Sequence, residues 1–164
     1  MHPHPASVHF PIAFLTLTCG LDLLDGLNAD SFAVKALKSD IDITKGAYYL
    51  QVLGLITAIP AIVTGFTSTT QIALSQGVIE KQTKNLRPKF VKTFFHSLAS
   101  TIAVLGNLGI WYCGRSAGKK LEPVALGIET ALCVLMFIGA NIGGTLVFTH
   151  GMGFSGLQRK NKPE

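Results

Sequence analysis

The stretch Ala47 to Thr67, with the sequence AYYLQVLGLITAIPAIVTGFT, decides the fold of this chain. It contains no charged side chain, whereas Asp, Glu, Lys and Arg make up 14% of the whole sequence. The hydrocarbon core of a bilayer is crossed by about 20 apolar residues in helical form. Because backbone polar groups in lipid must be satisfied within the segment itself, the stretch predicts a membrane-spanning helix.

Three further apolar stretches lie on either side of this one, so that the four run over about 8–24, 47–67, 90–113 and 124–148. Any one of them could be a buried helix of a soluble protein. Four in a row without polar stripes are not typical of a small soluble bundle. The sequence therefore predicts an all-α fold, a four-helix transmembrane bundle with both termini on the same side. Residues 1–153 form the membrane domain in this interpretation, and residues 154–164 form a basic polar tail.

Between the spans, Ser31 to Ile43 predicts a helix at the membrane interface, because its apolar residues recur on one helical face. Residues 71–92 predict the most basic loop, and Gly114 to Pro123 predict a short turn. The stretch from Met1 to Phe10 has no Lys or Arg, so a cleaved signal peptide is not expected.

The formal net charge of +5 resides in the loops and the tail, which favours a lipid bilayer over nucleic acid as the partner. We call the side of the membrane that holds the N-terminus the N-terminal face, and the other side the opposite face. Basic residues then divide eight to six in favour of the N-terminal face, so the positive-inside rule predicts cytoplasmic termini. The eight are Lys81, Lys84, Arg87, Lys89, Lys92, Arg159, Lys160 and Lys162, and the six are Lys35, Lys38, Lys45, Arg115, Lys119 and Lys120.

All five histidines fall on the N-terminal face once the passes are counted. His2, His4 and His9 precede or begin the first span, and His150 follows the fourth. His96 lies six residues into the third span, about 9 Å from its start at 1.5 Å per residue. An imidazole inside a membrane helix marks a functional site by default, since it is costly to leave unpaired.

Neutral imidazoles gathered at one face can bind a transition metal, and two of them can be the axial ligands of a haem between helices. We therefore expect His9, His96 and His150, with His4 as a further candidate, to bind haem b or a transition metal. The expected role is electron transfer or a redox accessory function, with a membrane redox partner or a second copy of the chain.

Asp22 and Glu129 lie near the opposite face and could form a polar site for a cation or a proton. The dipole of the fourth helix also explains an acid near its start. Two alternatives to a redox role thus stay open, a cofactor-free structural or assembly protein and a small ion or proton transporter. The sequence has no nucleophile–base pattern and no glycine-rich phosphate loop, so it is not expected to be an enzyme by itself.

Several motifs resemble one family across about residues 4–153. They are HPHPASVHFPIA at 2–13, LG, IPA and G within 53–65, HSL at 96–98, and GGTLVFTHGMG at 143–153. The chain resembles the predicted membrane proteins known as domain of unknown function 2231.

The resemblance implies a compact four-helix membrane domain, in which His4 or His2, His9, His96 and His150 are the motif histidines. Some relatives carry a Rieske-type iron–sulfur domain or lie among respiratory proteins, which implies electron transfer by analogy. This chain lacks iron–sulfur ligands of its own, so a redox role requires a haem, a metal or a partner.

Overall fold

The computed structural model describes residues 4–26, 42–79 and 84–150, and the regular secondary structure within these ranges is helical. A single isolated bridge, between Ile79 and Leu86, is the one strand-like pairing in the described part. The all-α prediction is therefore confirmed. The helices are α1 (His4–Ser7), α2 (His9–Gly26), α4 (Ile43–Gln76), α5 (Pro88–Tyr112) and α6 (Pro123–His150).

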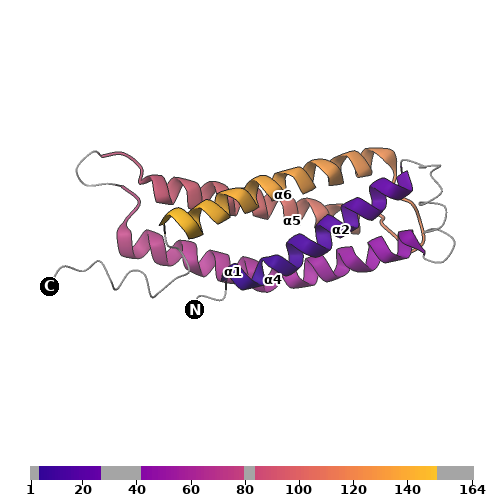
Figure 1. Ribbon diagram of the computed structural model, residues 1–164, viewed down its shortest axis with the longest axis horizontal. Helices are drawn as coiled ribbons and strands as arrows, with labels where there is room; N and C mark the ends of the chain where they lie inside the picture. Colours follow the sequence, from indigo (N-terminus) through magenta and orange to yellow (C-terminus); the bar gives the residue numbers. More distant parts are fainter. Residues whose placement is uncertain (1–3, 27–41, 80–83, 151–164) are drawn as a thin grey trace.

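The bundle consists of two antiparallel helix pairs, α2 with α4 and α5 with α6 (Figure 1). The pairs join where α4 contacts α5 and where α2 contacts α6. At one end α2 and α5 finish while α4 and α6 begin, and we call this the opposite end. The N-terminal end is where α1 begins and α6 finishes. The four long helices therefore alternate in direction, and the four residues of α1 precede α2.

Three helices are long and apolar enough to cross a membrane, over Ile43–Gln71, Pro88–Tyr112 and Pro123–Thr149. Helix α2 has 18 residues and is less apolar, because Asp22 and Asp25 lie in its last two turns. The predicted helices at 47–67, 90–113 and 124–148 thus correspond to three candidate spans. The helix predicted at 8–24 corresponds to α2 (His9–Gly26), whose acidic residues distinguish it from the three candidate spans.

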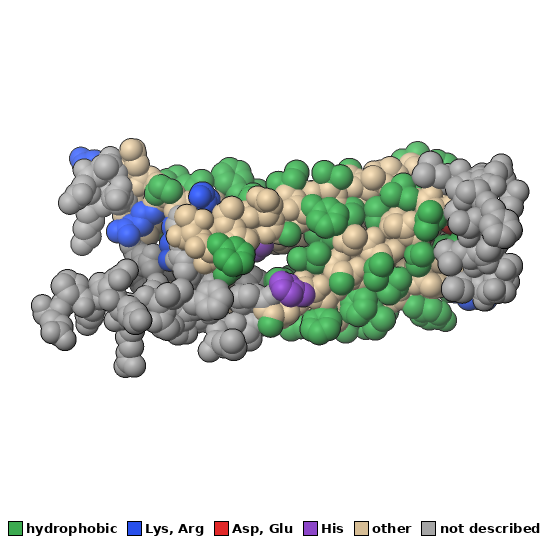
Figure 2. All heavy atoms as spheres, viewed as in Figure 1, with side chains coloured by type: hydrophobic (Ala, Val, Ile, Leu, Met, Phe, Trp, Pro, Cys, Tyr) green, Lys and Arg blue, Asp and Glu red, His purple; other side chains and the backbone are tan. Residues whose placement is uncertain are grey.

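The distribution of side chains is reversed relative to a soluble protein. Large apolar side chains cover the outside along the length of the helices (Figure 2), and Phe66 and Phe148 are 74% and 88% exposed. The buried apolar cluster is small, consisting of Leu15, Ala103 and Met136. Polar and charged side chains are buried instead, namely Thr18, Asp22, Asp25, Gln51, Thr93, Asn107 and Glu129. Such a surface suits lipid, since contiguous apolar patches of this extent are rare on soluble monomers.

Helix α4 is longer than the apolar stretch that predicts it. It begins at Ile43, where the side chain of Asp42 accepts a hydrogen bond of 3.0 Å from the backbone N–H of Lys45. It ends at Gln76, before Gly77 with its positive φ of 70°. The predicted loop at 71–92 was therefore wrong at both ends, because polar residues extend α4 to Gln76 and Pro88 starts α5. The interfacial helix predicted at 31–43 lies, over 31–41, outside the described residues.

Both helix pairs are held close at a glycine. A Cβ added to Gly54 of α4 would lie 2.7 Å from Cδ2 of Leu15 and 3.4 Å from the backbone nitrogen of Leu15 in α2. A Cβ added to Gly106 of α5 would lie 2.5 Å from a methyl carbon of Leu132 in α6. Small residues at such contacts let membrane helices approach closely.

Candidate functional site

The four histidines in the described helices lie toward the N-terminal end of the bundle. His9 is the exposed first residue of α2, and His96 is a half-buried residue in the third turn of α5. His4 begins α1 and His150 ends α6. The side chains of His4 and His150, and the whole of His2, lie outside the described part of the structure. The structure therefore gives side-chain geometry for two of the four predicted ligands.

His96 is fixed against α6. Its Nδ1 lies 2.7 Å from the carbonyl oxygen of Gly139. Because a carbonyl oxygen only accepts, we assign the proton to Nδ1, which makes Nε2 the ring nitrogen with the lone pair. The ring also packs on Gly143, where an added Cβ would lie 2.7 Å from Cε1. Two glycine positions of α6 thus set the position and the tautomer of this imidazole.

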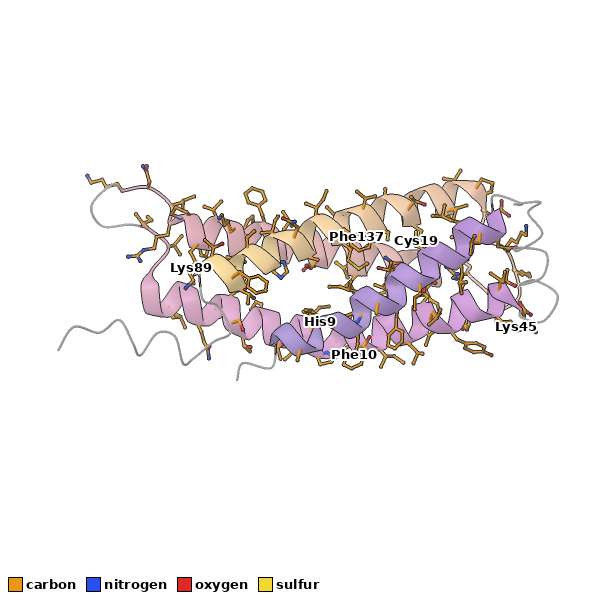
Figure 3. The ribbon with its side chains drawn as sticks, in the orientation of Figure 1. His9, Phe10, Cys19, Lys45, Lys89 and Phe137 are labelled. Atoms are coloured by element: carbon orange, nitrogen blue, oxygen red, sulfur yellow. The ribbon has the colours of Figure 1, made fainter. Side chains whose placement is uncertain are left out.

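Near the N-terminal end α4 and α5 remain in contact, with the hydroxyl oxygens of Thr69 and Ser97 3.4 Å apart, whereas α2 and α6 lie apart. Figure 2 shows an opening between them, with histidine side chains at its two sides. In Figure 3, His9 lies on the edge of α2 that borders this space, whereas His96 is bound to α6. Among the described residues no group of three or more His, Cys, Asp or Glu side chains is arranged to hold a metal ion. His9 and His96 therefore lie on opposite sides of this opening.

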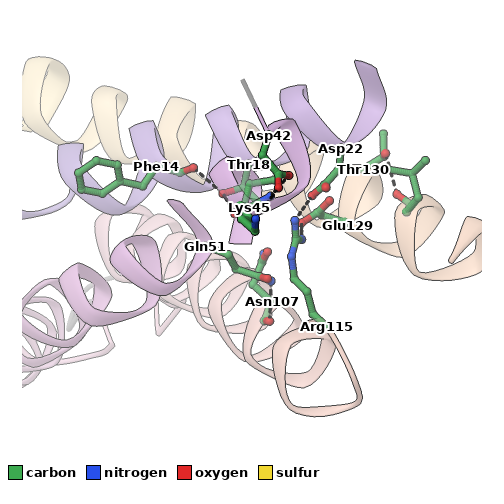
Figure 4. Close-up of polar contacts among 12 residues, drawn as sticks. Phe14, Thr18, Asp22, Asp42, Lys45, Gln51, Asn107, Arg115, Glu129 and Thr130 are labelled. Carbon is green, nitrogen blue, oxygen red and sulfur yellow. Dashed lines mark hydrogen bonds and ion pairs between the residues drawn. The ribbon is translucent and has the colours of Figure 1, made fainter. Parts of the chain in front are cut away.

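A buried ionic cluster lies at the opposite end. Arg115, in the turn after α5, donates from one guanidinium nitrogen to Asp22 of α2 at 2.5 Å. A second guanidinium nitrogen donates to Glu129 of α6 at 3.0 Å (Figure 4). The side chains of Arg115, Asp22 and Glu129 are only 3%, 4% and 1% exposed. One cation therefore joins α2 and α6, and the predicted acidic pair is brought together.

This cluster is unbalanced in charge and in hydrogen bonds. Asp22 and Glu129 provide two carboxyl groups against the single guanidinium of Arg115, and the carboxyl groups also interact with each other. The Oε2 atom of Glu129 is buried without a hydrogen-bond partner. Buried polar atoms in proteins are nearly always paired, so this oxygen calls for an explanation.

A neutral polar layer lies deeper in the bundle (Figure 4). Gln51 of α4 donates from its amide nitrogen to the carbonyl oxygen of Asn107 in α5 at 3.0 Å. The hydroxyl of Thr18 in α2 is within 3.5 Å of the carbonyl oxygen of Ala47 in α4. These contacts join α4 to both α5 and α2, so polar side chains connect all the long helices at this end.

A second ion pair lies closer to the surface. Lys120 Nζ is 3.4 Å from Oδ1 of Asp25 and donates to the Asp25 carbonyl oxygen at 2.8 Å. Its side chain is 51% exposed, whereas that of Asp25 is 10% exposed. Both acids of α2 therefore have a basic partner in the turn between α5 and α6.

Arg115 was not among the residues predicted for a site. By sequence it is one of six basic residues assigned to the opposite face, with nothing in its neighbourhood to single it out. A signal does exist, because Arg115 follows α5 by only three residues and Asp22 and Glu129 lie at a similar depth below the same face. A long arginine side chain at a helix end can reach such acids.

The family model described as predicted membrane protein (DUF2231) matches residues 2–156. No curated protein and no solved structure matches the chain. The match spans all the helices that enclose the opening and the ionic cluster. This chain therefore belongs to the DUF2231 family of predicted membrane proteins.

Proposed function

We propose that this membrane protein binds haem b in the opening between the two helix pairs and transfers electrons through it. His9 and His96 would hold the haem iron, with His150 as the alternative partner of His96. The observation that carries the proposal is the opening itself, which has histidine side chains on both sides (Figure 2). A haem held by two imidazoles would need one histidine on each side of it.

The local geometry of His96 supports this role. Metal-ligating histidines generally donate their other ring N–H to a carbonyl or carboxylate, which fixes the ring and its tautomer. His96 has such a bond from Nδ1 to Gly139, so Nε2 is the proposed ligand atom. The glycine at position 143 provides the room that this ring orientation needs on α6.

The two histidines whose side chains are described match the number of protein ligands that a haem can take. Haem needs only two ligands from the protein, whereas a zinc site takes three or four. The described part of the chain contains no group of three metal-binding side chains. A bound haem would supply one-electron chemistry, and this chain would hold its iron and shield the slot with apolar helices.

We also propose that α2 is a fourth membrane span. Its acidic residues make it less apolar than the others, yet Asp22 and Asp25 are buried and paired with Arg115 and Lys120. The exposed side of α2 carries apolar side chains such as Leu17. The proposed arrangement puts both termini on one side, and the eight-to-six distribution of basic residues favours the cytoplasm.

An absorption spectrum of the purified chain, oxidised and then reduced with dithionite, tests the haem proposal. We expect a Soret band and the bands of a low-spin haem with two imidazole ligands. His96→Ala should abolish binding, whereas His2→Ala, which alters a histidine that precedes all the helices, should retain it. Absence of a Soret band, together with no transition metal by elemental analysis, would show that the histidines have another role.

A cofactor-free structural role is the second candidate, and one observation favours it. The hydrogen bond between His96 and Gly139 joins α5 to α6 and needs no cofactor. In that case His96→Ala would lower the thermal unfolding midpoint, and the wild-type protein would have no visible absorption band. The spectrum and the unfolding curve together therefore separate the two candidates.

A further inference from the structure

We propose that Asp22, Glu129 and Arg115 form a buried binding site for one proton, which the two carboxyl groups share. The site lies at the opposite end of the bundle from the histidines. It is independent of the haem proposal, because none of its residues contributes to the opening between the helix pairs.

The first argument is the charge balance. With both acids ionised, the cluster would carry a net charge of −1, from two carboxylates and one guanidinium. All three side chains are at least nine-tenths buried. An uncompensated buried charge is costly, and the group takes up a proton instead where it can. One proton makes the cluster neutral.

The second argument is the hydrogen-bond pattern. Arg115 bonds one oxygen of Asp22, Oδ2, and one oxygen of Glu129, Oε1. The remaining oxygen of Glu129, Oε2, is buried without a partner, although the two carboxyl groups interact. Two carboxylates that share a site repel each other, so one of them takes up a proton and donates a hydrogen bond to the other. A proton between the two carboxyl groups removes the repulsion and gives Oε2 of Glu129 a hydrogen-bond partner.

The surrounding groups neither neutralise nor replace this proton. Helix α2 contributes Cys19 and α6 contributes Cys133, both of which are free thiols. Helices α4 and α5 contribute the amides of Gln51 and Asn107. The nearby cations are already paired, Lys45 with Asp42 at 2.9 Å and Lys120 with Asp25 at 3.4 Å.

A proton fits the site better than a metal cation. The guanidinium of Arg115 already occupies one oxygen of each carboxyl group and brings a positive charge into the cluster. The positive guanidinium would repel a multivalent metal cation beside it. A proton adds only the single charge that is missing and needs no further ligands.

Infrared spectroscopy of the purified full-length chain, recorded as a function of pH, tests the proposal without any variant. Exposed carboxyl groups are ionised at pH 7, since their ordinary pKa values are about 4. We therefore expect the C=O band of about one protonated carboxyl group per chain at pH 7. The band should shift in heavy water and disappear at high pH. A wild-type spectrum with no such band at pH 7 would overturn the proposal.

Matched variants locate the band. Glu129→Gln should remove it, and Asp22→Asn should remove or shift it, because each change eliminates one of the two sharing groups. Glu122→Gln, at an exposed carboxylate just before α6, should leave it unchanged. A band that persists in both Glu129→Gln and Asp22→Asn belongs elsewhere and contradicts the proposal. Loss of the wild-type band on addition of NaCl at constant pH would also contradict it, because sodium would then be the bound cation.

Discussion

At the scale of single residues, glycine in α6 decides how His96 is held. A Cβ at position 143 would lie 2.7 Å from Cε1 and 3.0 Å from Nδ1 of the imidazole. The neighbouring Gly144 has nothing within 4 Å of its added Cβ. The two positions are adjacent in sequence and differ in what they face, so they form a natural comparison.

Gly143→Ala should therefore displace the His96 ring and destabilise the protein by about 1–3 kcal/mol, the usual effect of overpacking. Gly144→Ala should be neutral or slightly stabilising, since Ala favours a helix over Gly. Thermal unfolding in detergent measures both. If haem is bound, Gly143→Ala should also lower its occupancy. Equal unfolding midpoints for the two variants would mean that the ring does not rest on Gly143.

Arg115 is the second decisive residue. Removing one partner of a buried ion pair leaves the other charge uncompensated and destabilises proteins by about 3–5 kcal/mol. Arg115→Ala leaves two buried carboxyl groups, so we expect a loss of this order in unfolding experiments. Lys119→Ala is the control, because Lys119 is exposed and surface substitutions stay within about ±0.5 kcal/mol. Adding Asp22→Asn to Arg115→Ala should recover part of the loss, and no recovery would argue against charge as the cause.

The sequence alone identifies the two acids of the ionic cluster but not the arginine that joins them. Asp22 and Glu129 could be singled out because an acid within an apolar stretch is conspicuous. Arg115 was treated as one basic residue of a turn, because a linear sequence does not tell which way its side chain points. The contact between His96 and Gly139 is likewise hidden, since 43 residues separate the two. Which side chains meet depends on the rotation of each helix about its axis, and apolar stretches without a polar stripe do not fix it.

At the scale of elements, the positions of the helices were largely predictable and their ends were not. The length of the apolar stretches predicted both ends of α5 and of α6 to within two residues. It failed for α4, which extends past the apolar stretch on both sides to cover Ile43–Gln76. Helix ends depend on caps such as Asp42 and on a residue such as Gly77 with positive φ. Hydropathy does not detect these local features.

The start of α4 gives a prediction with a definite pH dependence. Hydrogen bonds from Lys45 and Thr44 lower the pKa of Asp42 from 3.8 to about 2. Because the folded pKa is the lower one, the cap stabilises the helix start above pH 3.8 and is lost as the pH falls through about 2. Asp42→Ala should speed hydrogen exchange at the Lys45 amide at neutral pH, whereas Asp42→Asn should keep the cap. Unchanged exchange in Asp42→Ala would show that this bond does not hold the first turn.

The contact between α2 and α4 gives a second prediction about the helices. Gly54→Ala places a methyl group 2.7 Å from Leu15 Cδ2, and the Leu15 backbone at 3.4 Å limits how far α2 can yield. We expect a lower unfolding midpoint for Gly54→Ala and little change for Gly20→Ala, whose added Cβ meets nothing within 4 Å. Combining Gly54→Ala with Leu15→Ala should cost less than the sum of the single changes. Strict additivity would mean that the two residues do not touch.

At the scale of the whole molecule, the two ends of the bundle carry different chemistry. The N-terminal end has an opening with histidines, and the opposite end has a closed ionic cluster that joins α2 to α6. The apolar surface between them suits lipid on every side that the helices present. The ionic cluster joins α2 to α6 at the opposite end, so these two helices can lie apart at the N-terminal end while the bundle stays assembled.

Membrane topology is the property that decides between three and four spans, and labelling of single cysteines from either side measures it. With α2 as a span, the two termini and Thr83 face one side, while Ser39 and Ala117 face the other. If α2 instead stays at one surface, only α4, α5 and α6 cross, and the N-terminus joins Ser39 on the side away from the C-terminus. The experiment needs a background without Cys19, Cys113 and Cys133, since Cys113 is exposed in the native chain. We expect four spans, because the pairing of Asp22 with Arg115 and of Asp25 with Lys120 removes the charges that would exclude α2 from lipid. Termini labelled from opposite sides would refute this arrangement, and His9 and His96 would then no longer lie at the same membrane face.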